Sequence, residues 1–241
     1  MSEYLNGISE EFKKSIGSIL NTHSNMSEIE EDYELTYNNG AAIYEWNFKY
    51  SNVESSLSAF PYIKCFTAKS GSWKFPIIID YNNKIIFTLM KESNVDAKRK
   101  VINQPLHYEK RLCKINKHIY NQQTLNIGQQ ESNYEILSSL CSDITPEDVP
   151  EDLIHSLITF DSSSGEIKSI RANVFDEWLS LIEHPTNWSN YIEINYPRSN
   201  SSSKAAKRQI QINNEKVVQL TKKKEQLISM KTEESQKEKD N

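Results

Sequence analysis

Glycine is scarce in this sequence, with 6 residues among 241. None of them forms a G-x-G-x-x-G or G-x-x-x-x-G-K-[ST] pattern, in which glycine lets the backbone approach a phosphate closely. The sequence also lacks G-x-S-x-G, the strand-to-helix turn that exposes a nucleophilic serine in α/β-hydrolases. These absences remove the best sequence support for a nucleotide-binding fold and for that class of hydrolase.

Cysteine is also rare, and its three copies, Cys65, Cys113 and Cys141, form no C-x-x-C motif. An odd number of distant cysteines favours reduced thiols in the cytoplasm. Cys113 lies among the basic residues Lys110, Arg111, Lys114 and Lys117, which could lower the pKa of its thiol. Its spacing from Leu112 and Ile115 more simply predicts a buried helix position.

Histidine offers no chelating pair. The five histidines are His23, His107, His118, His155 and His184. No two of them are three or four positions apart, the spacing that would place two metal ligands on one helix face. We therefore predict no metal site and no cofactor.

Long hydrophobic runs are missing as well. No apolar run approaches the roughly 20 residues of a membrane span, and residues 1–7 lack the basic and apolar regions of a signal peptide. The sequence predicts a soluble, cytoplasmic protein that does not contact a membrane.

The densest apolar stretch is residues 73–91, W-K-F-P-I-I-I-D-Y-N-N-K-I-I-F-T-L-M-K. Because paired asparagines tolerate the positive φ of a two-residue type I′ turn, Asn82 and Asn83 predict a hairpin in which Ile79 faces Ile86. Both faces of the hairpin are apolar, which predicts a central position in a sheet covered on both sides. One face carries Trp73, Phe75, Ile77, Ile79, Ile86 and Met90, and the other carries Ile78, Ile85, Phe87 and Leu89.

Two residues of this hairpin give more specific predictions. Pro76 has no amide donor, so its strand should be fully paired on one side only. Asp80 lies beside the turn, where a carboxylate commonly accepts hydrogen bonds from nearby backbone amides. A turn-capping role is therefore a simpler interpretation of Asp80 than a catalytic one.

Hydrophobic periodicity predicts further elements on both sides of this hairpin. They are a helix at 9–21, a strand at 43–50, a strand at 62–67, helical structure at 96–120 broken by Pro105, a short helix at 134–142, a second hairpin of 153–160 and 166–175, a helical turn at 176–183 and a strand at 191–196. In the helical turn, Trp178, Leu179 and Ile182 are expected to be buried, and Trp188 should close the core.

Charge is distributed unevenly around a net value of −5. Residues 201–241 hold ten Lys or Arg and six Asp or Glu, and the body before them is acidic. The most basic part of the body contains Lys98, Arg99, Lys100, Lys110, Arg111, Lys114 and Lys117. These seven residues are candidates for a nucleic-acid phosphate patch, whereas a solvated helix face is the alternative that the pattern favours.

A nuclease-like arrangement is the sharpest enzymatic candidate. Asp161 followed by Glu166 and Lys168 imitates a pattern in which two acids hold Mg²⁺ and a lysine lies beside the scissile phosphate. The gap between the two acids is short for that purpose, and D-S-S-S-G suits a hairpin turn. We therefore expect no catalysis from these residues.

Several motifs between residues 33 and 196 resemble an uncharacterised protein family of low-GC Gram-positive bacteria and their phages. The shared features are G-A-A at 40–42 with Trp46, S-G-S-W-K-F-P at 70–76, L-M-K at 89–91, H-Y-E-K-R-L at 107–112 with Asn116, I-T-F-D-S-S-S-G-E-I-K at 158–168 and W-S-N-Y at 188–191. The resemblance implies one domain in a bacterial or phage setting, and it transfers no activity.

These patterns predict an α+β protein: a single mixed domain with central antiparallel hairpins, plus a flexible, basic C-terminal helical tail. We expect an N-terminal amphipathic helix and acidic connector at 1–32, the α+β core at 33–198, and a polar hinge with a basic, partly helical or disordered tail at 199–241.

The absence of compact catalytic motifs favours a non-catalytic intracellular interaction protein, in a phage or mobile element, that binds a host factor. The alternative is a DNA- or RNA-acting protein, either a nucleic-acid-binding protein or a Mg-dependent nuclease. The sequence thus favours a protein that is not an enzyme and that has a protein partner. Nucleic acid is a further possible ligand, and the sequence does not define the oligomeric state.

Overall fold

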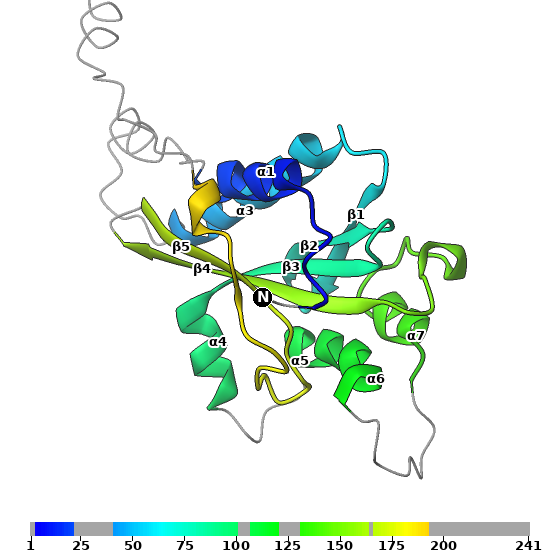
Figure 1. Cartoon of the computed structure of the whole chain (residues 1–241). Coiled ribbons are helices and arrows are strands. Elements are labelled where there is room, and N and C mark those ends of the chain that lie inside the picture. Colours follow the sequence, from blue (N-terminus) through cyan, green and yellow to red (C-terminus); the bar gives the residue numbers. More distant parts are fainter. Residues whose placement is uncertain (1–2, 22–40, 101–106, 121–130, 164–165, 193–241) are drawn as a thin grey trace, which may run out of the picture. The chain divides into compact units, whose positions relative to one another are not determined.

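The computed structural model describes residues 3–21, 41–100, 107–120, 131–163 and 166–192. The chain divides into two units, Met1–Glu193 and Ile194–Asn241, and every described residue lies in the first. In that unit helices flank a six-stranded mixed sheet, which confirms the α+β class (Figure 1). The predicted tail at 199–241 lies outside the described residues.

The sheet combines an antiparallel meander with one parallel pair. In spatial order its strands are β1 (Ile63–Ser70), β2 (Trp73–Asp80), β3 (Ile85–Lys91), β4 (Ile154–Ser163), β5 (Glu166–Asn173) and β6 (Thr186–Asn187). β3 and β4 are parallel, and the other neighbouring pairs are antiparallel. Parallel neighbours need a crossover connection, which is usually helical. Here the chain between β3 and β4 contains the helices that form this crossover.

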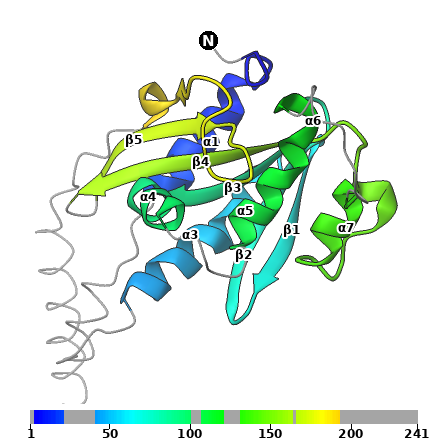
Figure 2. The ribbon, with the colours of Figure 1, turned by 90° about the horizontal axis from the view of Figure 1, so that it is seen from below.

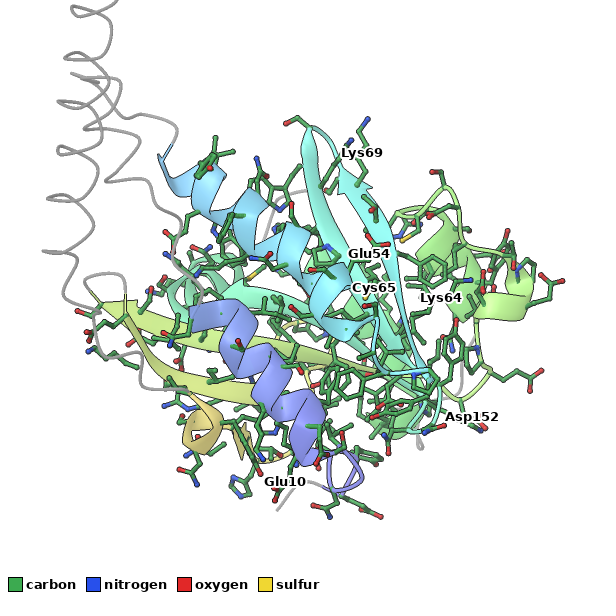
Figure 3. The ribbon with its side chains drawn as sticks, turned by 90° about the horizontal axis from the view of Figure 1, so that it is seen from above. Glu10, Glu54, Lys64, Cys65, Lys69 and Asp152 are labelled. Atoms are coloured by element: carbon green, nitrogen blue, oxygen red, sulfur yellow. The ribbon has the colours of Figure 1, made fainter. Side chains whose placement is uncertain are left out.

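The helices cover both faces of the sheet. One face carries α1 (Glu10–Asn21) and α3 (Ala41–Leu57), which lie side by side across the strands (Figure 3). The opposite face carries α4 (Glu92–Arg99), α5 (Tyr108–Cys113), α6 (Lys117–Tyr120) and α7 (Asn133–Ser138). Short 3-10 turns occur at η1 (Lys114–Asn116), η2 (Pro146–Asp148) and η3 (Ser189–Tyr191). None of the helices in the described ranges has the length and apolar character needed to cross a bilayer.

The central hairpin has the two buried faces that its sequence predicts. Ile77 and Ile79 belong to the core beneath α4, α5 and α7, whereas Ile78 and Phe87 belong to the core beneath α1 and α3. Ile79 pairs with Ile86, as predicted. The pairing of β2 with β3 covers residues 78–80 of β2 and does not include Pro76, which pairs with Thr67 of β1. This proline therefore lies where its strand is paired on one side, as expected.

The predicted type I′ turn is wrong, although the hairpin is right. Four residues, 81–84, connect β2 to β3, and the positive φ of 53° falls on Lys84. Asp80 accepts hydrogen bonds from the backbone N of Asn83 at 3.0 Å and from its Nδ2 at 2.7 Å. The carboxylate of Asp80 thus caps the turn, which confirms its structural interpretation.

The strand predicted at residues 43–50 is instead part of helix α3. Trp46, Tyr50, Val53 and Leu57 recur at intervals of four, three and four, and Val53 and Leu57 are fully buried against the sheet. The aromatic content of the segment suggested a strand, but aromatic preference for strands depends on context. The apolar residues of this segment recur at helical spacing, so a helix buries them on one face against the sheet.

Residues 176–183 form a turn, and the predicted burial of Trp178 is wrong: the indole is 65% exposed. Leu179 is buried as predicted, and its backbone adopts a positive φ of 63°. The strand expected at 191–196 is also wrong in its described part, because Tyr191 ends the 3-10 turn η3. Trp188 is 1% exposed and closes the core beneath α1, as predicted.

Candidate functional site

A cavity of about 400 Å³ opens at the end of the sheet where β1 and β3 end and β2 begins. We call it the end pocket. Figure 2 shows α3, α4 and α5 around this end of the sheet. The pocket is lined by Trp46 and Tyr50 from α3, Ser70 and Trp73 from the β1–β2 hairpin, Leu89 and Met90 from β3, Asn94 and Lys98 from α4, and His107 and Tyr108 at the start of α5.

Aromatic rings form much of the wall of the end pocket. Trp46 and Tyr50 lie one helical turn apart on α3, with ring centroids 5.0 Å apart. Trp73 packs edge-on against both of them, at 6.5 Å from Trp46 and 6.1 Å from Tyr50. Across the pocket Tyr108 stacks on Phe75 at 4.0 Å, which fixes the orientation of its ring. Such rigid rings offer flat apolar surfaces to a planar ligand.

The rim of the end pocket is basic. His107 caps α5: its Nδ1 accepts a hydrogen bond from the backbone N of Glu109 at 3.3 Å. Partial burial and the nearby charges of Lys98 and Lys110 lower the pKa of His107 to about 4. The ring is therefore neutral at pH 7, and because Nδ1 accepts, its proton lies on Nε2. The ammonium groups of Lys98 and Lys110 are thus close enough to His107 to affect its pKa, and the ring itself carries an N–H donor. This combination of charges and a donor suits an anion.

The structure divides the seven basic candidates of the sequence into two groups. Arg111 and Lys114 both contact Glu131, at 3.1 and 2.9 Å, and Lys117 contacts Glu177 at 3.3 Å. These three cations thus already have carboxylate partners, which come from segments distant in sequence and could not be predicted from local spacing.

Two of the other four basic candidates, Lys98 and Lys110, are associated with the end pocket. Lys98 lines it, and Lys110 acts with Lys98 on the pKa of His107. Arg99 contacts Asp96 at 3.1 Å, and Lys100 is exposed at the end of α4. The cations that a ligand of the pocket would meet are therefore at the end of α4 and the start of α5.

Behind the pocket lies a buried polar network of Thr88, Glu109, Cys113, Asn116 and His155, all at most 1% exposed. The Thr88 hydroxyl donates to Glu109 Oε2 at 3.0 Å and lies 2.9 Å from His155 Nε2. Because a hydroxyl has a single proton, His155 Nε2–H must donate to Thr88. The Cys113 thiol then donates to His155 Nδ1, at 3.5 Å.

Burial keeps this network uncharged. It lowers the pKa of His155 to about 3 and raises the pKa of Glu109 to about 8. It also raises the pKa of the Cys113 thiol well above its ordinary value. Cysteine, histidine and glutamate are the residue types of a nucleophilic triad. Here the thiol is protonated and fully enclosed, so the structure confirms Cys113 as a buried helix residue rather than an activated nucleophile.

Asn116 ties this network to the sheet. Its Nδ2 donates to the carbonyl oxygens of His155 and Phe175 at 2.9 and 2.8 Å, and its Oδ1 accepts from the backbone N of His155 at 2.7 Å. The side chain thereby satisfies three buried backbone groups, as buried polar groups require. The network is a structural support beneath the end pocket.

The nuclease-like residues Asp161, Glu166 and Lys168 lie at exposed positions of β4 and β5. Lys168 Nζ binds Glu166 Oε2 at 2.6 Å on an exposed strand face, and Asp161 is exposed opposite Ser169. Within the described ranges, no group of three or more His, Cys, Asp or Glu side chains could hold a metal ion. The exposed strand face matches the structural interpretation of Glu166 and Lys168.

Sequence reasoning did not identify the end pocket as a site. Trp46 and Tyr50 were assigned to a strand, and Trp73 to one face of the hairpin. The available signal was the i, i+4 spacing of Trp46 and Tyr50, which places both rings on one side of a helix. Their convergence with Trp73 and Tyr108 depends on the three-dimensional packing.

Comparison with known proteins gives a family match over nearly the whole chain. The model of a family described as "Family of unknown function (DUF5986)" matches residues 5–241. No curated protein and no solved structure matches the sequence. The family match covers the end pocket and the buried network, and it transfers no activity to either.

Proposed function

We propose a function for this chain from its own geometry, because it belongs to the DUF5986 family, whose function is unknown. The protein is a non-catalytic binding protein, and its ligand is single-stranded nucleic acid that places a base in the end pocket. The observation that carries this proposal is the combination of aromatic walls with a basic rim in one cavity.

The two parts of the pocket match the two parts of a nucleotide. Bases stack on aromatic side chains with little dependence on sequence, because every base has a flat π face. The phosphate that follows the base would meet Lys98 and Lys110, and the Nε2–H of His107 can donate a hydrogen bond to it. None of the described residues that line the pocket is an aspartate or a glutamate, so none of these side chains repels a phosphate.

The size of the pocket favours a single strand. Its volume of about 400 Å³ lies in the range of small-molecule sites, which admits one nucleotide and excludes a duplex. A base can enter such a cavity when it is unpaired, as in the loops and ends that RNA-binding proteins recognise.

Binding of fluorescent single-stranded oligonucleotides, measured by anisotropy, tests the proposal. Lys98→Glu should weaken binding about tenfold or more and reduce the dependence of log Kd on log salt by about one. Lys14→Glu makes the same charge change at an exposed position of α1 and serves as the control. Equal affinities for the Lys98→Glu and Lys14→Glu proteins, or no binding by the wild type, would exclude the end pocket as a nucleic-acid site.

The protein partner expected from the sequence remains a prediction, as do the cytoplasmic location and the phage or mobile-element setting. A pull-down of the tagged protein from its host, with and without nuclease treatment, separates the two kinds of ligand. A co-purifying protein that survives nuclease treatment supports a direct host factor, whereas one that is lost was attached through nucleic acid.

A further inference from the structure

A second aromatic side chain of interest, that of Trp178, is exposed to solvent on a hydrogen-bonded turn. Trp178 is 65% exposed, although tryptophan is usually among the more buried residues. Asp176 Oδ1 accepts hydrogen bonds from the backbone N of Trp178 at 2.9 Å and from that of Ser180 at 2.8 Å. The turn therefore holds the indole outward through its own hydrogen bonds.

The residue after Trp178 anchors the turn. Leu179 has its side chain 1% exposed in the core and its backbone at φ 63°, a conformation that L-residues other than glycine rarely adopt. Strain of this kind persists where the surrounding structure fixes it, and it is common at functional sites. The buried leucine thus fixes the position of the exposed tryptophan beside it.

Helix α4 connects this turn to the end pocket. Arg99 Nε donates to the carbonyl oxygen of Leu179 at 3.0 Å, and its guanidinium lies over the ring of Phe175. The preceding residue, Lys98, lines the end pocket, and the following one, Lys100, is exposed. Three consecutive cations therefore lie between the pocket and the turn, and Figure 1 shows the chain after β5 descending beside α4 and α5.

The two acidic residues of the turn, Asp176 and Glu177, have partners within the protein. Glu177 is paired with Lys117 at 3.3 Å, and Asp176 is held by backbone amides. A phosphate chain that crosses the end of α4 would thus meet Lys98 and Lys100 before it reaches the indole, whereas Arg99 is already bound to Asp96 and to the carbonyl of Leu179. An exposed aromatic ring at the end of a basic path is the arrangement that single-strand-binding proteins use for successive bases.

We propose that Trp178 is a second base-stacking position, and that the ligand is a single-stranded oligonucleotide running from the end pocket across the end of α4, rather than a free nucleotide. This inference rests on the proposed function of the end pocket. Beyond that function, the inference specifies that the ligand is longer than one nucleotide and that it leaves the pocket across the end of α4.

The test compares ligands of increasing length, from a nucleoside monophosphate to an oligonucleotide of about ten nucleotides. Wild-type affinity should rise with length. Trp178→Ala should lower the affinity for the longest ligand about tenfold, the effect of losing one stacked base, and leave monophosphate binding unchanged. Leu181→Ala, at another exposed apolar residue of the same segment, should leave both affinities close to wild type.

The outcomes separate this inference from the proposal on which it rests. If Trp178→Ala retains the full gain of affinity with length, or weakens the monophosphate and the oligonucleotide by the same factor, Trp178 is not a second stacking position. In either case the end pocket can still bind a nucleotide. If wild-type protein binds no ligand of the series, the proposed function fails and this inference fails with it.

Discussion

At the scale of single residues, Glu109 and His155 show how burial sets protonation at the centre of this fold. Both side chains are enclosed beside Thr88 and are uncharged at neutral pH, because burial lowers the pKa of His155 to about 3 and raises the pKa of Glu109 to about 8. Glu109 also faces Tyr50 and Tyr108, whose pKa values are raised, chiefly by burial and further by the Glu109 carboxylate. Burial raises the pKa of Glu109 more than the hydrogen bonds from Thr88 and Tyr108 lower it, so ionisation of this carboxyl group is unfavourable in the folded protein.

This arrangement predicts a pH-dependent stability that Glu109→Gln removes. The pKa of Glu109 rises on folding from 4.5 to about 8, so the folded state holds the proton more tightly. The associated stability is complete below pH 4.5 and is lost as the pH rises through 8. Relative to the Gln variant, the wild type should lose about 1.4 kcal/mol of unfolding free energy per pH unit in this window.

Urea denaturation of both proteins between pH 5 and about pH 9 measures this difference. His155 has the opposite dependence, because its pKa falls on folding from 6.5 to about 3, so its stability is lost as the pH falls below 6.5. Comparison with the variant isolates Glu109, since both proteins contain His155. Parallel stability curves would show that Glu109 is already ionised in the folded protein.

At the scale of elements, the β2–β3 hairpin organises the fold. It contributes buried side chains to both cores, and its strands lie between β1 and β4. The helices on each side bury apolar stripes against it, with Phe12 and Ile16 of α1 on one face and Leu112 of α5 on the other. Loss of either face should therefore affect the whole first unit.

Ile79→Asp should destabilise the protein by several kcal/mol, because it buries an unpaired carboxylate in an apolar site. Ile43→Asp makes the same substitution near the start of α3, where the side chain is 56% exposed, and should change stability by less than about 0.5 kcal/mol. Thermal unfolding followed by circular dichroism checks both. A wild-type melting temperature for Ile79→Asp would contradict the central position of the hairpin.

The hairpin could be predicted from sequence because its signal is local: two apolar strands alternate around a turn, so both faces and the register follow from spacing. The same reasoning failed for α3, where aromatic residues are compatible with either element and burial against the sheet decided the outcome. It also failed at Trp178, because the buried position went to Leu179 and left the indole outside. The end pocket was not predicted because its walls come from five separate segments: α3, the β1–β2 hairpin, β3, α4 and the start of α5.

At the scale of the whole molecule, the chain consists of two units with different charge. The buried apolar residues of the described ranges run from Leu5 to Trp188, all in the first unit. The segment 201–241 carries ten Lys or Arg and six Asp or Glu, whereas the rest of the chain is acidic. Nucleic acid could therefore be attracted by the C-terminal segment as well as by the end pocket.

Deletion of residues 201–241 should leave the melting temperature of the first unit unchanged, because every described residue of both cores lies in that unit. Calorimetry on the full-length and shortened proteins measures this. A melting temperature lowered by several degrees would show that the C-terminal segment packs on the first unit, and that the boundary between the units is misplaced.

The most direct test of nucleic-acid binding in the end pocket is ultraviolet cross-linking of the full-length protein to a single-stranded oligonucleotide. Mass spectrometry then identifies the cross-linked peptides. We expect cross-links at the aromatic residues of the end pocket, Trp46, Tyr50, Trp73 or Tyr108, and their loss in Lys98→Glu. Cross-links confined to residues 193–241, or equally strong in wild type and Lys98→Glu, would contradict it.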